Sequence, residues 1–365
     1  MKIVVIEASA LHLGFLGCYG NDWVATPNLD RLAAEGIVFD QHIADWPEPM
    51  RARQHPLITG RCIGAELHLL PASHPLIHFH RATVIADLAT WEPRQRPIQW
   101  HDGPSLAPPW WKLPRDLLMA YAEEGSNQPV MADPPIGLVR LDDVDLDRLQ
   151  LTYASVVTYF DAKLGHFLDR LSEQELFDHV LVCVTARCGF PLGEHGMVGL
   201  ERAWLHEELV HVPLVIRLPG AEHAGLRVPA LTQSVDLVTT FRDFLGEPPE
   251  PAHGRSLLPL IRGEIEQIRP YAVSGQRVGG SGEWLLRTPR RALLFPVQVP
   301  DADPPRRPQV YVKPDDRWEV NDIAARCEEE VQQLELTLRA FVEEASKPGP
   351  LDYPPLPAQT ASALT

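Results

Sequence analysis

Short apolar runs alternate with amphipathic stretches along most of the chain, and this alternation predicts strands and helices in turn. Residues 1–6 form an apolar run typical of a buried parallel strand. Residues 26–36 are expected to form a helix, with Pro27 near its first position and Gly36 at its end. Such an order predicts an α/β protein with helices packed on a mostly parallel sheet.

The longest periodic segment predicts an amphipathic helix over residues 149–171. Apolar residues recur there at every third or fourth position, which places them on one helix face. Strands are expected at 179–185 and 212–217, and another helix at 234–246. A shorter helix is expected at 83–89.

The pattern changes past about residue 265, where short alternating segments replace the long helices. Short strands are expected around Tyr271 and at 284–287 and 292–295, followed by a closing helix over 327–345. We therefore predict three parts: an α/β domain at 1–260, a small carboxy-terminal subdomain at 261–346, and a flexible tail at 347–365, rich in Pro, Ala and Ser.

Three motifs near the amino terminus occur in a fixed order: "LGCYG" at 16–20, "TPNLDRLAAEG" at 26–36 and "LITGR" at 57–61. In this order and at these separations they resemble the amino-terminal half of a sulfatase, within the alkaline-phosphatase-like superfamily. The resemblance continues over 149–260 and 309–345, whereas 62–148 match poorly. It implies a three-layer α/β/α fold with a smaller carboxy-terminal α+β subdomain.

The same resemblance implies where catalytic groups would stand. Sulfatases place an aspartate pair for a divalent cation after the first strand, and gap-free counting from "GCYG" puts it on Ser9 and Ala10. The nucleophile, a Cys or Ser matured to formylglycine, falls on Met50, and its supporting arginine falls on Gln54. The chain therefore departs from the family pattern at the nucleophile and at the first ligand pair.

Further positions of the family site also carry other residues. The second ligand pair, before "GEHG", falls on Arg187 and Cys188, and the active-site lysine falls on Arg202. In "QWHDG", similar to the family's "GKWHLG", His101 keeps the histidine while Gln99 stands in place of the lysine. A hard divalent cation needs several oxygen or imidazole ligands, and an arginine repels it. We therefore expect no catalytic residue, no bound metal and no cofactor.

The resulting functional prediction is a sulfatase-like pseudoenzyme that acts by binding a small anion or a protein partner. The alternative is an active sulfuric or phosphoric ester hydrolase of the sulfatase family with rebuilt active-site groups. No other nucleophile or nucleotide-binding motif offers a replacement activity.

Four arginines are candidates for anion binding: Arg51, Arg53, Arg187 and Arg202. They come from three segments that the family fold brings together at the carboxyl ends of strands. Without a cation, such a cluster could hold an anion through charge-assisted hydrogen bonds. Alternatively, each arginine pairs with a nearby carboxylate, such as Glu7, or with a backbone carbonyl.

Two groups of histidines raise the question of a metal site. His206 and His211 are five residues apart, so on a helix their side chains diverge by about 140° and cannot share a zinc ion. Four more histidines crowd one segment: His68, His74, His78 and His80. Without cysteine or carboxylate at ligand spacing, ordinary surface or core histidines are favoured there.

Composition limits the partners and the compartment. A formal charge of −16 argues against nucleic acid and anionic membrane surfaces as partners. No apolar run approaches the length of a membrane span, and the first residues lack the pattern of a signal peptide. The five cysteines lack paired spacing, which favours reduced thiols. We expect a cytoplasmic protein, and its oligomeric state stays open.

Overall fold

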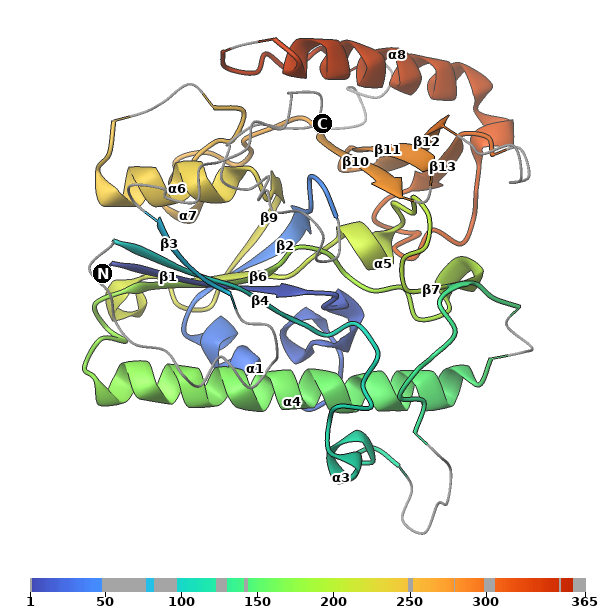
Figure 1. The fold of residues 1–365 in the computed structure, drawn as a ribbon. Coiled ribbons are helices and arrows are strands. Elements are labelled where there is room, and N and C mark those ends of the chain that lie inside the picture. The colour runs from blue at the N-terminus through green and yellow to red at the C-terminus, as the bar shows by residue number, and fades with distance from the viewer. Residues whose placement is uncertain are drawn as a thin grey trace. The chain divides into compact units, whose positions relative to one another are not determined.

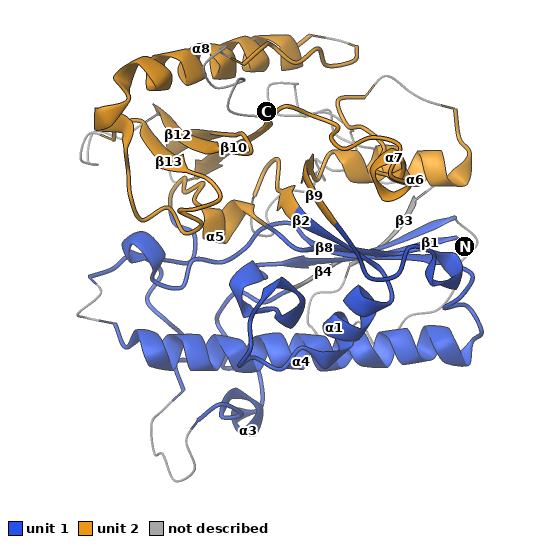
Figure 2. Ribbon diagram, turned by 180° about the vertical axis from the view of Figure 1, so that it is seen from behind, with its two compact units in different colours: residues 1–40, 73–201, 212–227 blue, residues 41–72, 202–211, 228–365 orange. Residues whose placement is uncertain are grey.

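The structure, a computed structural model, describes residues 2–47, 77–81, 97–122, 130–140, 144–248, 252–278, 280–298, 306–347 and 349–356. These residues divide into two units (Figure 2). Unit 1 contains residues 1–40, 73–201 and 212–227, and unit 2 contains residues 41–72, 202–211 and 228–365. Residues 228–260, which the sequence analysis assigns to the larger domain, fall in unit 2 in this division.

A sheet of seven described strands, in the order β3-β4-β1-β6-β8-β2-β9, crosses unit 1 (Figure 1). Its strands are β1 (Ile3–Ser9), β2 (Ile37–Ile43), β3 (Ile77–Arg81), β4 (Ile98–Ser105), β6 (Leu181–Ala186), β8 (Leu214–Arg217) and β9 (Leu226–Gln233). The last residues of β2 and most of β9 belong to unit 2.

The direction of the strands corrects one expectation. β1 runs parallel to β4 and β6, and β3 runs parallel to β4, as predicted for a mostly parallel sheet. β8 runs antiparallel to both β6 and β2, so the sheet is mixed. All seven residues of β1 are buried, including Glu7 and Ser9, which brings polar side chains into the centre of the sheet.

Two helices lie against one face of this sheet in unit 1 (Figure 1). α4 (Leu146–Glu173) confirms the predicted long helix, beginning three residues earlier, and its apolar stripe is buried. α1 (Pro27–Ala34) is anchored to it, because Asp161 of α4 accepts the backbone N–H groups of Asn28 and Leu29 at 3.0 and 2.8 Å. The carboxylate therefore satisfies free donors at the start of α1.

The remaining described elements of unit 1 are short. Besides short 3-10 helices, they are α3 (Arg115–Leu118) and the antiparallel pair β5 (Gly137–Leu138) and β7 (Met197–Val198). The helix expected at 83–89 lies outside the described residues. None of the helices in the described part of the chain is long and apolar enough to cross a membrane.

Unit 2 contains the predicted antiparallel strands and the closing helix. Its sheet has the order β10-β11-β12-β13, and its helices are α5 to α8. The elements are β10 (Ala272–Val278), β11 (Ser281–Arg287), β12 (Arg291–Gln298), β13 (Gln309–Val312), α5 (Glu207–Val210), α6 (Asp236–Leu245), α7 (Leu258–Ile261) and α8 (Glu328–Ala345). α8 packs on the sheet through Leu334, Leu338 and Phe341, all fully buried.

Residues 349–356 pack against the same core. Leu351 is buried in it, and Tyr353 and Leu356 lie against it. This part of the expected tail has a defined place in the structure. Residues 357–365 lie outside the described residues.

Candidate functional site

The ends of β1 and β6 bring together four of the predicted site positions. Because the two strands are parallel neighbours, Ser9 and Ala10 follow one strand beside Arg187 and Cys188, which follow the other. The N–H of Leu11 donates to the carbonyl of Cys188 at 3.0 Å. The Ser9 Oγ lies 3.9 Å from the Cys188 Sγ, and both side chains are buried.

Ala10 has an unusual backbone conformation that α4 supports. Its φ is 59°, in the left-handed region that costs energy for a residue with a Cβ. The hydroxyl of Tyr153, on α4, donates to the carbonyl of Ala10 at 2.6 Å and accepts the N–H of His12 at 2.8 Å. The turn after β1 is therefore held by a buried tyrosine.

Arg187 forms an ion pair with Glu7 inside unit 1. The Arg187 Nη2 lies 3.3 Å from the Glu7 Oε2, and the Trp100 Nε1 donates to the same oxygen at 3.0 Å. Glu7 is fully buried, and the Arg187 side chain is 13% exposed. Arg187 therefore follows the alternative to anion binding, in which the arginine pairs with a nearby carboxylate.

These residues do not fit a hard divalent cation. Ser9 offers one hydroxyl, Ala10 offers no side-chain donor, and burial raises the pKa of the Cys188 thiol, which keeps it neutral. The guanidinium of Arg187 brings positive charge to the same place. Across the residues that the structure describes, no group of three or more His, Cys, Asp or Glu side chains could hold a metal ion.

Beside this turn lies a histidine–glutamate pair that sequence reasoning missed. His12 Nδ1 accepts the N–H of Gly14 at 2.9 Å, which leaves Nε2 to donate to Glu194 at 3.2 Å. Burial alone would raise the pKa of Glu194, but the hydrogen bond from His12 and the N–H of Leu192 lower it overall. Glu194 belongs to the "GEHG" motif, and nothing in the sequence connects that motif to His12.

His101 is directed to the other face of the sheet. It stands opposite Ile6 in the β1–β4 register and packs edge-on against Phe167 of α4, with ring centroids 5.2 Å apart. Side chains alternate along a strand, so Trp100 and Glu7 point the opposite way. The structure therefore does not bring His101 to the Glu7–Arg187 pair.

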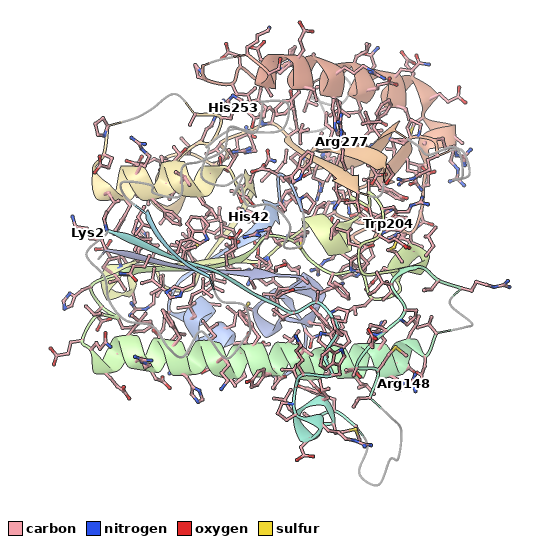
Figure 3. All side chains as sticks on the ribbon, in the orientation of Figure 1. Lys2, His42, Arg148, Trp204, His253 and Arg277 are labelled. Atoms are coloured by element: carbon pink, nitrogen blue, oxygen red, sulfur yellow. The ribbon has the colours of Figure 1, made fainter. Side chains whose placement is uncertain are left out.

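The other predicted site residues divide between unit 2 and the undescribed part. Arg202 lies in unit 2, where its guanidinium stands 5.7 Å from the ring centroid of Trp204; Trp204 is labelled in Figure 3. The positions that lie outside the described residues are Met50, Arg51, Arg53, Gln54, His68 and His74. His78 and His80 lie on β3. The anion-binding cluster stays a prediction.

A buried ionic cluster occupies unit 2 at the start of α5. His206 Nδ1 lies 2.8 Å from Glu319, and His211 Nδ1 lies 2.6 Å from Glu207. The Lys313 Nζ lies 2.8 Å from Glu207 and 3.0 Å from Glu319, and so bridges the two carboxylates. Burial would raise the pKa of Glu207, but His211 and Lys313 together lower it. Each histidine thus binds its own carboxylate, and sequence reasoning did not find this cluster because Lys313 and Glu319 lie about a hundred residues away.

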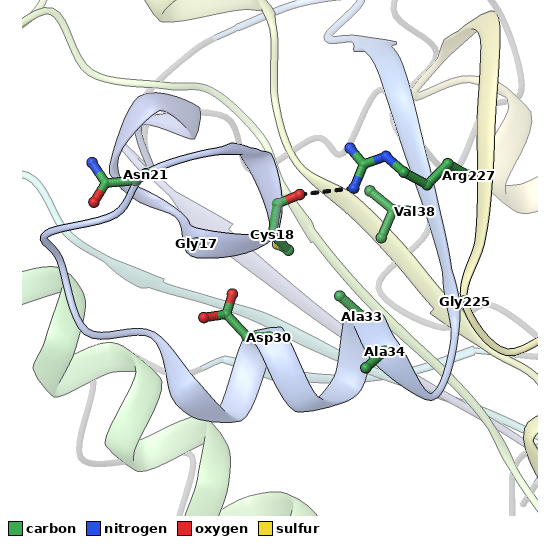
Figure 4. Close-up of a pocket in the computed structure, with 9 residues that line it drawn as sticks. All are labelled: Gly17, Cys18, Asn21, Asp30, Ala33, Ala34, Val38, Gly225 and Arg227. Carbon is green, nitrogen blue, oxygen red and sulfur yellow. Dashed lines mark hydrogen bonds between the residues drawn. The ribbon is translucent and has the colours of Figure 1, made fainter.

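A cleft of about 430 Å³ opens in unit 1 beside α1 (Figure 4). It is lined by Gly17, Cys18, Asn21, Asp30, Ala33, Ala34, Val38, Gly225 and Arg227. Arg227 donates to the Cys18 carbonyl at 3.0 Å and pairs with Asp40, while Asp30 accepts the Thr26 hydroxyl at 3.3 Å. Burial, and then the charge of Asp30, raises the pKa of Cys18 to about 12, so its thiol is neutral. These groups hold the turn before α1 and supply no activated nucleophile.

Solved structures with the same fold cover nearly the whole chain. The phosphonate monoester hydrolase of Agrobacterium radiobacter superposes with a TM-score of 0.66 at 17% identity, covering 93% of this chain and 96% of its own. BT4656, solved with its substrate D-glucosamine-2-N,6-O-disulfate, reaches a TM-score of 0.72 at 18% identity, covering 94% of this chain and 98% of its own. The predicted alkaline-phosphatase-like α/β fold with a smaller carboxy-terminal subdomain is confirmed.

Sequence comparisons find sulfatases over parts of the chain. The family described as "N-sulphoglucosamine sulphohydrolase, C-terminal" matches residues 193–272. An N-acetylglucosamine-6-O-sulfatase of Bacteroides thetaiotaomicron is 35% identical over 113 residues, which are 31% of this chain and 20% of that protein. These local matches support the sulfatase and alkaline-phosphatase-like family that the sequence motifs indicate.

Sequence similarity to other relatives of this sulfatase-like chain is also local. The alkaline phosphatase superfamily protein PehA of Trinickia caryophylli is 32% identical over 123 residues, 33% of this chain and 24% of PehA. The matched segments span about a fifth to a quarter of the curated relatives' length. The comparisons therefore show the fold of this chain and support the family resemblance, and the activities of those relatives do not carry over to it.

Proposed function

We propose that this sulfatase-like protein is catalytically silent and acts by binding. The groups at the ends of β1 and β6 support this proposal. Ser9, Ala10 and Cys188 supply no carboxylate, and Arg187 is paired with the buried Glu7. Hydrolysis of sulfate or phosphate esters in this fold needs charge stabilisation next to a nucleophile. A positive side chain engaged by an internal carboxylate is a poor substitute for a cation.

Between the two forms of binding, a protein partner is better supported than a small anion at this site. An anion would need the guanidinium of Arg187 to leave Glu7, which would remain buried without its partner. Removing the partner of a buried carboxylate costs about 3–5 kcal/mol of stability. An anion bound through Arg51, Arg53 or Arg202 stays a separate proposal.

The competing function is an ester hydrolase with rebuilt catalytic groups, and an activity assay separates the two. The purified chain is incubated with aryl sulfates, aryl phosphates and aryl phosphonates, each with calcium, magnesium, manganese or zinc supplied. We expect no turnover that depends on Ser9 or Arg187, because the buried Ser9 hydroxyl lies beside the neutral thiol of Cys188 and Arg187 is paired with Glu7. Turnover that is lost in Ser9→Ala or Arg187→Met, while a surface variant such as His179→Gln retains it, would establish the hydrolase instead.

A cytoplasmic location is part of the same proposal. Cys18, Cys183, Cys188 and Cys327 are free thiols in the described residues. Free, mostly buried cysteines are typical of proteins kept in reducing compartments.

A further inference from the structure

The carboxy-terminal strap, defined as residues 349–356, inserts a tyrosine into a built pocket of unit 2. Tyr353 packs edge-on against Tyr271, with ring centroids 5.2 Å apart, and its ring is tilted against that of Phe341, with centroids 5.6 Å apart. The guanidinium of Arg255 stands over its ring at 5.1 Å, and that of Arg269 at 5.9 Å. Two aromatic rings and two cations thus surround one side chain.

The tyrosine pocket, defined as Arg255, Arg269, Tyr271 and Phe341, contacts both the ring and the hydroxyl of Tyr353. The rings and guanidinium groups contact the face and edge of the aromatic ring. The Arg269 Nη1 donates to the Tyr353 hydroxyl at 2.9 Å. A phenylalanine would lose this hydrogen bond, and an aliphatic side chain would lose the cation–π contacts as well.

The walls of the pocket are held by groups outside the strap. Arg269 is fully buried and pairs with Asp236, and its Nη1 also donates to Gln233 at 2.6 Å. Arg255 donates to the carbonyl of Ile268. Tyr271 and Phe341 are both fully buried in the core of unit 2. Because these anchors do not involve the strap, the pocket should keep its shape when the strap leaves.

The strap on either side of Tyr353 is recognised at defined points. Leu351 is 5% exposed and enters the apolar core, and Leu356 packs against the same core. The Tyr271 hydroxyl donates to the carbonyl of Pro354 at 2.8 Å. Two consecutive prolines restrict the segment to few conformations, which lowers the entropy lost on binding. The contacts therefore describe a motif of leucine, any residue, tyrosine, proline, proline and leucine.

We propose that the tyrosine pocket and the adjoining groove form a peptide-binding site for a proline-flanked tyrosine segment of a partner protein. The chain's own strap occupies the site in the isolated protein and competes with the partner. A tethered segment acts at an effective concentration of about millimolar, so a partner gains access when it binds more tightly or when the strap is released. The site lies wholly in unit 2 and does not depend on whether the protein hydrolyses esters.

The test uses the full chain carrying Tyr353→Ala and a fluorescent octapeptide with the sequence of residues 349–356. We expect saturable binding in fluorescence polarisation, at least about tenfold tighter than to the wild-type chain, whose strap competes. Adding Arg255→Ala should weaken binding several-fold to about tenfold, because it removes a cation–π contact. The same peptide with alanine in place of tyrosine should not bind.

A second strap variant and a wild-type measurement cover the case in which Tyr353→Ala does not fold. Leu351→Ala loosens the strap and leaves Tyr353 in place, and a fluorotyrosine peptide at millimolar concentration can be followed on the wild-type chain by fluorine NMR. Failure of the peptide to bind every folded variant and the wild type would overturn the proposal. A wild-type dimer that becomes monomeric in Tyr353→Ala would also overturn it, because a second copy would then be the occupant.

Discussion

At the scale of single residues, the pair of Glu7 and Arg187 holds two charges inside unit 1. Glu7 is fully buried and shares one carboxylate oxygen between Arg187 and Trp100. Removing one member of a buried pair leaves the other charge in a medium that solvates it poorly. The pair should therefore matter more when it is broken than when it is replaced as a whole.

A double-mutant cycle tests this pair. Arg187→Met should lower the free energy of unfolding by about 3 kcal/mol, since the Glu7 carboxylate stays buried without its partner. Adding Glu7→Gln should recover part of the loss, because a neutral amide can still accept from Trp100. Urea unfolding of the two single variants and the double variant measures the coupling.

The matched control for the cycle is Arg148→Met, which breaks the half-exposed pair of Arg148 and Asp145 at 3.8 Å. It should cost less than about 1 kcal/mol. Additive effects of Glu7→Gln and Arg187→Met would show that the buried pair contributes no coupling energy.

His42 makes a second residue-scale prediction, in the dependence of stability on pH. It lies on β2 (Figure 3), and its side chain is fully buried. Burial, aided by the charges of His211 and Arg269, lowers the pKa of His42 to about 3. The folded protein therefore binds fewer protons than the unfolded chain, whose histidine titrates near pH 6.5. Stability from this group is present above pH 6.5 and is lost as the pH falls from 6.5 toward 3.

The expected loss from His42 between about pH 6.5 and about pH 4.5 is roughly 2 kcal/mol, because a tenfold difference in proton affinity between the folded and unfolded states corresponds to about 1.4 kcal/mol. His42→Gln should remove most of that slope, while the exposed control His179→Gln should leave it unchanged. Urea unfolding at a series of pH values gives the slope directly. An equal slope in wild type and His42→Gln would contradict the assignment.

At the scale of elements, the junction of α1 and α4 depends on a glycine in the middle of a long helix. A Cβ at Gly165 would meet the side-chain amide of Asn28 at less than van der Waals distance. Asn28 cannot move aside freely, because its N–H and its amide both donate to Asp161, at 3.0 and 2.8 Å. Close approach of the two helices therefore requires glycine at this position.

Replacing a glycine inside a helix by alanine normally stabilises the protein, but we expect Gly165→Ala to destabilise it. Helix propensity alone would raise the free energy of unfolding by about 1 kcal/mol. We expect a net decrease instead, of about 1–2 kcal/mol, since overpacking forces the junction apart. In an Asn28→Ala background the same change should be neutral or stabilising. Stabilisation in the wild-type background would contradict the described packing, and thermal unfolding is sufficient to measure it.

Elements were predictable from the sequence where their signal is local. The period of apolar residues in α4 and the apolar run of β1 follow from a few turns or residues of chain, and both are confirmed. The direction of β8 was not predictable, because it depends on pairing with β6 and with β2, which lies far away in the sequence. Glu7 is one of several carboxylates that the sequence offers to Arg187, 180 residues away, and only the neighbouring strands β1 and β6 bring the two together.

At the scale of the whole molecule, sequence motifs predicted the superfamily and the fold, and not the interactions particular to this chain. The motifs "LGCYG" and "TPNLDRLAAEG" fix a frame that comparison with solved structures confirms. The ionic cluster at Lys313 and the tyrosine pocket around Tyr353 join segments of unit 2 that carry no motif. Such contacts depend on side-chain placement after folding, which composition and periodicity do not specify.

The chain keeps the sulfatase-like fold, and we propose that it does so without the divalent cation on which catalysis in that family depends. Elemental analysis of protein purified without chelators, and dialysed against calcium, magnesium, manganese or zinc, tests it most directly. The groups at the ends of β1 and β6 predict far less than one divalent ion per chain, with no difference between wild type and Cys188→Ala. A stoichiometric divalent ion that disappears in Ser9→Ala or Cys188→Ala would show instead that the ends of β1 and β6 hold a cation.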